Sequence, residues 1–245
     1  MRLDEVRRKL AARARPDQLE GMARFGIVGG KRLGVSMPEL RKLAREIGRD
    51  HALALKLWET GIQDARILAS LVDLPAEVTE AQMEAWVRDL DSWDVCDQVC
   101  LNLFEKTPFA RKKIREWSRR PEEFVKRAAF ALLACVASHD RDAPDQDFLG
   151  FLSVIRKAAA DERNFVKKAV NWALRNIGKR NPVLNRAAID VARELLQNDS
   201  RAARWIASDA IRELESDAVR RRLESRKRDG AKPASRPRRP VAGDR

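Results

Sequence analysis

The chain of 245 residues is long enough for one large domain or two small ones with a full hydrophobic core, and its formal net charge is +13. Three cysteines and two distant histidines argue against a disulfide framework or a structural zinc site, and no apolar run is long enough to cross a membrane. The basic balance favours a polyanionic partner, most often nucleic acid, although a generally arginine-rich set of proteins would give the same charge.

The N-terminal stretch MRLDEVRRKLAARARP is charged and amphipathic, and it lacks the apolar core of a signal peptide. We therefore expect a cytoplasmic protein. Cys96, Cys100 and Cys135 lie in apolar helical contexts without a CxxC pair or a histidine cluster, so they are predicted to be small buried hydrophobes. We expect neither a metal nor a cofactor.

Helix signals follow one another along the chain, and strand signals are nearly absent. Ser36 and Glu39 form a capping box with a proline in the first turn, which predicts a helix that runs to Glu46 and ends near Gly48. Eleven further helices are predicted from capping residues, prolines and apolar periodicity: 50–59, 63–73, 79–90, 93–104, 108–117, 121–137, 146–160, 164–178, 182–197, 200–214 and 217–227.

Two stretches of these helices repeat each other. FVKRAAFALLA at 124–134 aligns with FVKKAVNWALR at 165–175, at an offset of 41, and a weaker copy begins near residue 202. A period near forty with two helices per unit is typical of HEAT-like repeats. We therefore predict an all-α, superhelical solenoid of HEAT-like antiparallel helix pairs over residues 1–227, with one concave face. Residues 228–245, rich in Pro, Gly and Arg, are predicted to be a disordered basic tail, and the protein to be a monomer.

The helix 165–178 combines an indole with cations. Trp172 lies off its buried stripe and shares a side with Lys168, Arg175 and Lys179, as is common where phosphates are held beside an aromatic face. The alternative is that Trp172 packs against the neighbouring repeat and the cations are its solvated fringe.

The same face of the earlier repeat carries Lys126 and Arg127, so successive repeats are predicted to form a basic track for a phosphate backbone. Each of these cations alone could be an ordinary solvated charge. Further candidates for DNA binding lie in two other segments: Lys31, Arg32, Lys179 and Arg180.

The stretch DSWDVCDQVC at 91–100 places Trp93 and Asp97 one above the other on a helix. A carboxylate on a basic surface is expected where that surface has to bind a cationic group. The alternative is that Asp97 pairs with Arg127 or another cation between two repeats, and that Trp93 belongs to the core.

The sequence resembles the AlkD-like family of DNA glycosylases, which act in DNA alkylation repair. Four stretches carry the resemblance: GVSMPELRKLAREI at 34–47, SWDVCDQV at 92–99, FVKRAAFALL at 124–133 and FVKKAVNWALRNIGKRNP at 165–182. It implies a solenoid that grips duplex DNA in its concave face and hydrolyses the N-glycosidic bond of cationic alkylated bases, of the N3-methyladenine and N7-methylguanine type, without enclosing the lesion.

By the same resemblance Asp97 is the catalytic carboxylate, Trp93 and Trp172 flank the damaged nucleotide, and Arg127 holds a phosphate. The partner would be duplex DNA containing alkylated bases, and the protein would be of a bacterial, nucleoid-associated type. Three departures put the substrate range in question: Ser92 replaces an aromatic residue, Phe124 replaces a tryptophan, and without any tyrosine an N-terminal aromatic role passes to Phe25 or is missing.

Two other functions remain open. A non-catalytic relative would bind damaged or branched DNA without releasing a base. A protein–protein scaffold of HEAT-like repeats would bind its partner independently of salt and would show no affinity for DNA, whereas phosphate-driven binding falls steeply with salt.

The tail gives a first test of these expectations. We predict that deletion of residues 228–245 weakens general DNA binding, because several Lys and Arg side chains are lost, and leaves base release in place. Titration of duplex DNA and an assay of released base check this, and complete loss of base release would contradict it.

Overall fold

A computed structural model describes residues 1–230 of the chain, and within them it contains fourteen α-helices, two short 3₁₀ helices and no strand beyond one isolated bridge between Lys31 and Ile62. The elements are α1 (Leu3–Ala11), η1 (Pro16–Gln18), α2 (Leu19–Arg24), α3 (Met37–Ile47), α4 (His51–Glu59), α5 (Gln63–Val72), α6 (Glu80–Arg88), α7 (Trp93–Asn102), η2 (Phe104–Lys106), α8 (Ala110–Trp117), α9 (Glu123–His139), α10 (Asp145–Ala158), α11 (Asn164–Gly178), α12 (Pro182–Leu196), α13 (Arg201–Leu214) and α14 (Asp217–Gly230).

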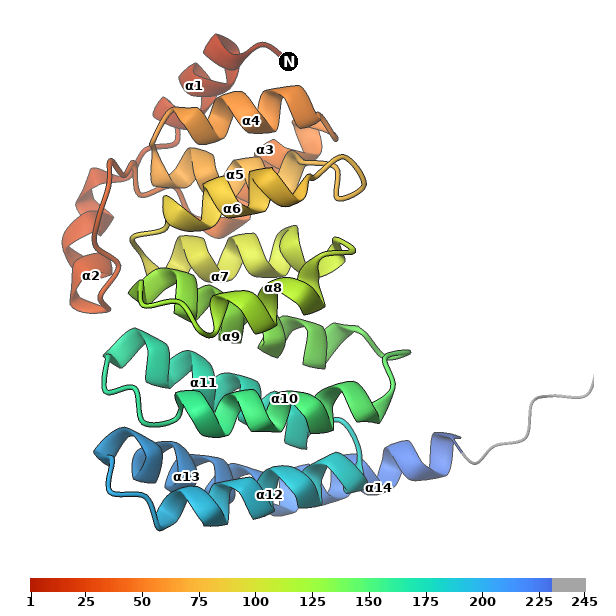
Figure 1. Cartoon of the computed structure of the whole chain (residues 1–245). Coiled ribbons are helices and arrows are strands. Elements are labelled where there is room, and N and C mark those ends of the chain that lie inside the picture. The colour runs from red at the N-terminus through yellow and green to blue at the C-terminus, as the bar shows by residue number, and fades with distance from the viewer. Residues whose placement is uncertain (231–245) are drawn as a thin grey trace, which may run out of the picture.

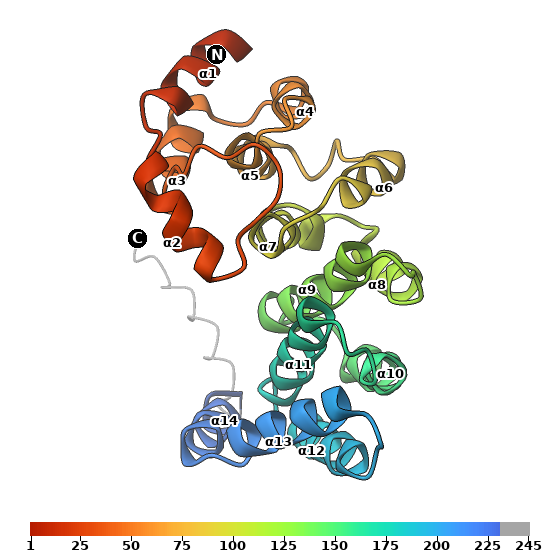
Figure 2. The ribbon, with the colours of Figure 1, turned by 90° about the vertical axis from the view of Figure 1, so that its left-hand side faces the viewer.

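The helices stack as antiparallel pairs in two layers (Figure 1). The inner layer consists of α3, α5, α7, α9, α11 and α13, each packed on the next, and the outer layer consists of α4, α6, α8, α10 and α12. Figure 2 shows that the stack is curved, with the inner helices along the concave side. The predicted solenoid of HEAT-like helix pairs is confirmed, and the twelve predicted helices correspond to α3–α14.

Two features of the chain's ends differ from the predictions. The N-terminal segment, not predicted to be helical, forms α1 and α2, and α1 buries Val6 and Leu10 against the first repeat. α14 continues to Gly230, past the predicted domain end at 227, and the rest of the predicted tail, residues 231–245, lies outside the described residues.

The inner helices are parallel to one another, because each outer helix returns the chain to the same edge of the stack. The N-terminal ends of α7, α9 and α11 therefore lie together at the edge next to α2 (Figures 1 and 2). Their C-terminal ends lie at the opposite edge, where α14 extends. Each helix end carries a partial charge, positive at the N-terminus and negative at the C-terminus, so the two edges of the concave face differ electrostatically.

A ladder of aromatic rings ties the outer helices together. The rings of Trp58 and Trp86 stack in parallel with centroids 4.0 Å apart, and Phe104 connects Trp86 to Trp117 with centroid distances of 6.4 and 5.8 Å. These four side chains come from α4, α6, η2 and α8 and are almost fully buried. Such rings bury large apolar areas, so the ladder is a main source of cohesion between the first repeats.

The N-terminal turns are held by a buried carboxylate. Asp64 on α5 accepts hydrogen bonds from the backbone amides of Leu33 and Val35, both at 2.7 Å. Arg32 in the same connection donates to Asp94 at the start of α7, at 2.7 Å. The connection between α2 and α3 is therefore fixed against the inner helices, and it carries the turn after α2 to the edge of the concave face (Figure 2).

We predict that Trp86→Ala lowers the free energy of unfolding by about 3–5 kcal/mol, because it removes the central ring of the ladder and leaves a cavity. Chemical denaturation followed by circular dichroism measures this. DNA affinity at 25 °C should not change, because α6 lies in the outer layer.

The matched control is Trp205→Ala. Trp205 is 41% exposed, so its loss should lower the free energy of unfolding by less than about 1 kcal/mol. Equal losses for the two tryptophans would show that the ladder contributes nothing beyond an ordinary surface ring.

Candidate active site

A cavity of about 560 Å³ opens on the concave side, at the edge where the N-terminal ends of α7, α9 and α11 meet the turn after α2. Its walls come from four segments that are distant in the sequence: Arg24, Phe25, Gly26, Trp93, Asp97, Arg127, Asn164, Phe165 and Lys168. The site combines one carboxylate, three aromatic rings and three cations.

The carboxylate is held by a two-pronged ion pair. Nε and Nη2 of Arg127 donate to Oδ1 and Oδ2 of Asp97 at 3.1 and 2.8 Å, and Nη1 of Arg127 donates to the backbone carbonyl of Phe165 at 2.7 Å. The pair left open by the sequence is therefore present and joins α7, α9 and α11. Both side chains nevertheless line the cavity, with 17% of the Asp97 side chain and 6% of the Arg127 side chain exposed.

Burial raises the pKa of the Asp97 carboxyl above its ordinary value, and the charge and hydrogen bonds of Arg127 oppose that shift. Low dielectric surroundings disfavour the charged form, while a cation within hydrogen-bond reach favours it. Asp97 is consequently a carboxylate whose ionisation depends on Arg127, in a place where electrostatic interactions are strong.

Aromatic rings surround the Asp97–Arg127 pair. The guanidinium carbon of Arg127 lies 5.9 Å from the ring centroid of Trp93 and 6.0 Å from that of Phe165. Trp93 is fixed in turn, because its Nε1 donates to the backbone carbonyl of Phe25 at 3.1 Å. The Phe25 side chain is 78% exposed and stands at the rim, which leaves a large apolar surface for a planar group to contact.

The turn after α2 requires a glycine. Gly26 has a φ of 73°, and a Cβ atom there would lie 3.2 Å from Cζ of Phe165. Any side chain would adopt a strained backbone conformation and press on the cavity wall. Four residues of the cavity wall were not predicted from the sequence to belong to the site: Arg24, Gly26, Asn164 and Phe165. For Phe165 a signal existed, since it aligns with Phe124 in the repeat, and the two rings touch with centroids 5.5 Å apart.

Trp172 does not reach this cavity. It lies on α11 one turn beyond Lys168, half-buried against the core, and the aromatic residue that α11 contributes to the cavity wall is Phe165. The structure therefore brings together Trp93, Asp97, Arg127 and Lys168 and places Trp172 farther along the concave face. Its predicted contact with a damaged nucleotide stays a prediction.

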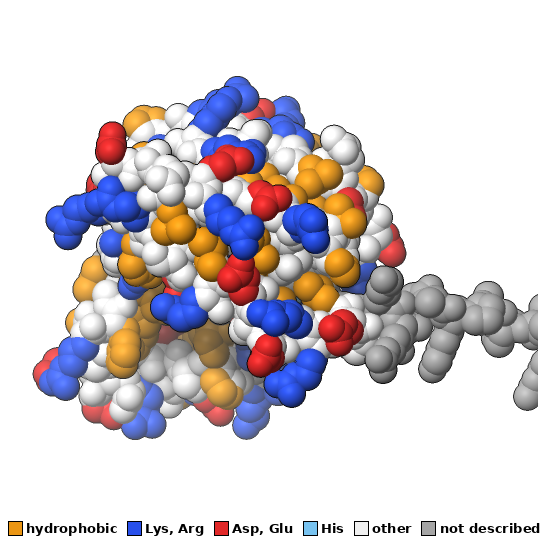
Figure 3. Space-filling view, turned by 90° about the horizontal axis from the view of Figure 1, so that it is seen from below, with side chains coloured by type: hydrophobic (Ala, Val, Ile, Leu, Met, Phe, Trp, Pro, Cys, Tyr) orange, Lys and Arg blue, Asp and Glu red, His pale blue; other side chains and the backbone are white. Residues whose placement is uncertain are grey.

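Most of the predicted DNA-binding cations have partners within the protein. Lys126 pairs with Asp161 at 3.2 Å, Arg175 and Lys179 pair with Glu213, and Arg32 pairs with Asp94. Arg180 donates to three backbone carbonyls and lies over the ring of Phe148. Of the predicted set, Lys31 and Lys168 form no ion pair with any described residue. Figure 3 shows the same mixture of Lys and Arg with Asp and Glu around the last repeat.

Arg127 was predicted to hold a phosphate, but in the structure groups of the protein itself bind its guanidinium. All its donor groups point to Asp97 and Phe165, and the side chain is almost fully covered. We therefore interpret Arg127 as the residue that positions the carboxylate. The departure at Ser92 has a related effect, because this buried serine contacts Arg32 and Asp94 and draws Arg32 away from the surface.

Within the described residues, no group of three or more His, Cys, Asp and Glu side chains is arranged to hold a metal ion, and no helix is long and apolar enough to span a membrane.

Comparisons with known proteins agree with this architecture. Residues 6–214 match the family described as "DNA alkylation repair enzyme". A solved structure from a family of proteins related to the HEAT-like repeat DNA glycosylases with affinity for branched DNA structures superposes with a TM-score of 0.76, at 17% identity, over 91% of this chain and 96% of that one. A designed armadillo repeat protein in complex with a (KR)4 peptide gives a TM-score of 0.34 at 17% identity, over 94% of this chain and 90% of that one.

No curated protein matches the chain. The likeness at 17% identity shows the fold alone, and the family rests on the match over residues 6–214. The chain belongs to the family of DNA alkylation repair enzymes.

Proposed function

We propose that this protein is a monofunctional DNA glycosylase that hydrolyses the N-glycosidic bond of cationic alkylated purines in duplex DNA. One observation carries the proposal. The Asp97 carboxylate lines a solvent-accessible, aromatic-lined cavity on the concave side, and it is more exposed there than its own cation, Arg127.

The chemistry of the lesion requires little more than a carboxylate. A purine alkylated on a ring nitrogen is positively charged and leaves as a neutral base, so no general acid is needed. Positive charge develops on the sugar as the bond breaks, and a nearby anion stabilises it. Two opposite unit charges ~4 Å apart attract by about 4 kcal/mol at an effective dielectric constant near 20, which is enough to accelerate bond cleavage substantially.

The position of Arg127 determines how much of the attraction between the Asp97 carboxylate and the cationic sugar remains. As a pair, Asp97 and Arg127 are neutral, so only their orientation gives the cavity a negative field. Arg127 binds the carboxylate through both oxygens and donates to the Phe165 carbonyl, so its three nitrogens are directed to partners within the protein and the carboxylate is the more exposed member of the pair. A carboxylate oxygen has about two lone-pair sites, so one site on each oxygen remains for the sugar or for the attacking water.

The aromatic walls favour a cationic nucleotide in the same place. The ring faces of Trp93 and Phe165 carry negative charge density, and a cation over such a face is stabilised by about 0.5–2 kcal/mol. The N-terminal ends of α7, α9 and α11 add partial positive charge at the rim, which favours DNA phosphates there, and Lys168 supplies a full charge. The site thus offers a negative centre within a positive surround.

The alternative is a non-catalytic protein that binds damaged or branched DNA. The structurally similar protein is described as having affinity for branched DNA, and the Asp97–Arg127 pair would then serve only to join three inner helices. The two functions are separated by whether a base is released.

The decisive experiment is Asp97→Asn. We predict that single-turnover release of N7-methylguanine or N3-methyladenine from methylated duplex DNA, identified by mass spectrometry, falls by about 10²–10³-fold, because a neutral amide cannot stabilise the cationic sugar. Affinity for undamaged DNA should not fall, since Asp97 repels phosphate rather than binding it.

Asp190→Asn is the matched control, because it removes the same charge from an exposed position on the outer helix α12. Thermal unfolding of both variants shows whether the fold is kept. If the wild type releases no methylated base, the binding alternative holds. If Asp97→Asn releases base as fast as the wild type, the carboxylate has no catalytic role.

The pH dependence tests the role of Arg127. Catalysis requires ionised Asp97, whose pKa burial raises, so base release should decline with acid at a pH above about 3.9, the ordinary aspartate value. In Arg127→Met the cation that lowers this pKa is gone, so the decline should move to higher pH. Rates measured from pH 4.5 to 8, after subtraction of spontaneous base loss, check this. A decline at the same pH in both proteins would contradict a positioning role for Arg127.

A further inference from the structure

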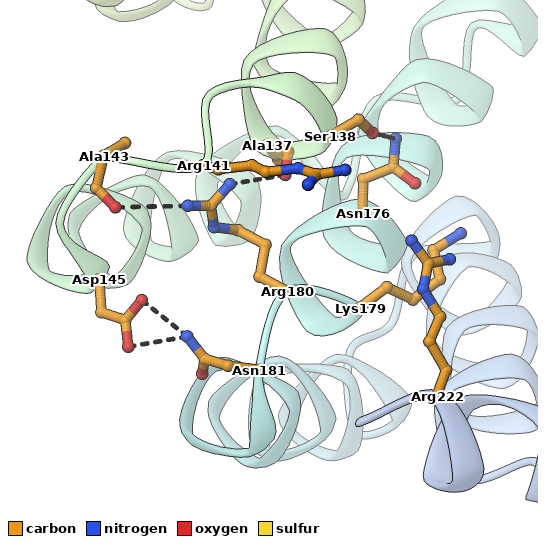
Figure 4. Close-up of a pocket in the computed structure, with 10 residues that line it drawn as sticks. All are labelled: Ala137, Ser138, Arg141, Ala143, Asp145, Asn176, Lys179, Arg180, Asn181 and Arg222. Atoms are coloured by element: carbon orange, nitrogen blue, oxygen red, sulfur yellow. Dashed lines mark hydrogen bonds between the residues drawn. The ribbon is translucent and has the colours of Figure 1, made fainter. Parts of the chain in front are cut away.

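A second cavity, of about 730 Å³, lies at the opposite end of α11. It is formed by the C-terminal ends of α9 and α11, the connection that follows α9, and α14 (Figure 4). Its lining is polar: Ala137, Ser138, Arg141, Ala143, Asp145, Asn176, Lys179, Arg180, Asn181 and Arg222. We call it the distal pocket.

Four cationic side chains and one carboxylate line the distal pocket. The carboxylate, Asp145, accepts hydrogen bonds from Nδ2 of Asn181 through both oxygens, at 2.8 and 2.9 Å, and so faces the wall. Lys179 contributes positive charge while it pairs with Glu213 at 2.7 Å. The net character of the pocket is strongly positive, which suits an anion.

Arg180 prepares the pocket for an anion without binding one. The C-terminal ends of α9 and α11 present carbonyl oxygens that would repel a phosphate. Arg180 donates to the carbonyls of Ala137 and Asp140, both at 2.8 Å, and to that of Ala143 at 3.3 Å. It therefore offsets the partial negative charge of the helix end. The other cations of the pocket then remain to contact an anion.

Arg141 and Arg222 are those cations. Both are exposed, and neither forms an ion pair with any residue in the described part of the chain. Figure 4 shows Arg141, Lys179 and Arg222 extending into the same open space from three different segments. Like charges held together are unfavourable unless an anion joins them, and a phosphate accepts several such donors at once.

The distance between the two cavities matches the geometry of DNA. α11 has 15 residues, so at about 1.5 Å per residue it separates the cavities by roughly 20 Å. The rise of B-DNA is about 3.4 Å per base pair, which makes this separation roughly six base pairs. On one face of α11, Lys168 lines the Asp97 cavity and Lys179 lines the distal pocket. Trp172 and Arg175 lie between them on that face, so the two cavities are connected along α11.

We propose that Arg141 and Arg222 in the distal pocket hold backbone phosphates of the duplex arm that extends from the damaged nucleotide, about six base pairs away. The proposal builds on the proposed function, which places the damaged nucleotide at Asp97. The distal pocket then sets the register of the DNA, while the Asp97 cavity performs the chemistry.

Single phosphates can be made neutral by methylphosphonate substitution in a duplex with a central abasic-site analogue, and the affinity of each duplex measured. With wild-type protein, neutral positions about six base pairs to one side of the lesion should weaken binding several-fold. With Arg141→Gln/Arg222→Gln they should have no further effect. The slope of log K against log salt should also become shallower by about 1.8 in the double variant, for two phosphates lost.

Lys56→Gln/Lys157→Gln is the matched control, since it removes two exposed cations from the outer helices α4 and α10. It should behave as wild type. The proposal is overturned if the distant neutral positions affect the double variant and the wild type alike, or if both double variants have the same salt slope. It is also overturned if calorimetry shows submillimolar binding of inorganic phosphate that depends on Arg141 and Arg222 while the DNA pattern is absent.

Base release is measured in parallel and separates the two proposals. A wild-type protein that releases no base but shows the distant phosphate pattern refutes the glycosylase and keeps the distal pocket. A protein that releases base without that pattern refutes the distal pocket alone.

Discussion

The contact between Arg127 and Asp97 is the constraint on which the concave face depends. It joins α7 to α9, and through the Phe165 carbonyl it includes α11, so one guanidinium fixes the relative position of three inner helices. Removing two charges from water costs about as much as their attraction returns, so such a pair adds little net stability. What it does provide is a defined direction for the carboxylate. An apolar contact of the same size would hold the helices together and leave the cavity without a negative centre.

The direction of the inner helices explains why the two cavities differ. The N-terminal ends of the inner helices meet at one edge, where their partial positive charge favours an anion around the Asp97 cavity. All the C-terminal ends meet at the other edge, where exposed carbonyls are unsuited to a phosphate until Arg180 occupies them. A solenoid of helix pairs thus has an inherent electrostatic polarity across its concave face. The side chains at each edge complement the partial charge of the helix ends there.

Local sequence patterns could predict the helices and much of the site, but contacts between distant segments could not be predicted. Apolar spacing places Trp93 and Asp97 on one face of α7, and the repeat at an offset of 41 predicts the stacking of α9 on α11. Nothing near Phe25 shows that this turn reaches α7, because the contact depends on the amides of residues 33 and 35 binding a carboxylate about thirty residues later. The sequence repeat shows that Phe165 aligns with Phe124, yet a phenylalanine at this position resembles an ordinary core residue. Trp172, with its neighbouring cations, had the stronger pattern and lies outside the cavity.

Net charge is a poor guide to where this protein would bind DNA, and the pairing of its charges is a better one. Most of the cations predicted to bind DNA are balanced by a neighbouring carboxylate, and an exposed pair of this kind stabilises the fold by only about 0–1 kcal/mol. A phosphate can therefore compete for such a cation, but it gains less there than at a cation without a partner. Among the described residues, Lys168 near one end of α11 and Arg141 and Arg222 near the other have no such partner. A DNA backbone that lies along α11 gains the most binding free energy when its phosphates reach the unpaired cations at both ends of this helix. The distance between these cations, rather than the total charge, would therefore determine how the duplex lies.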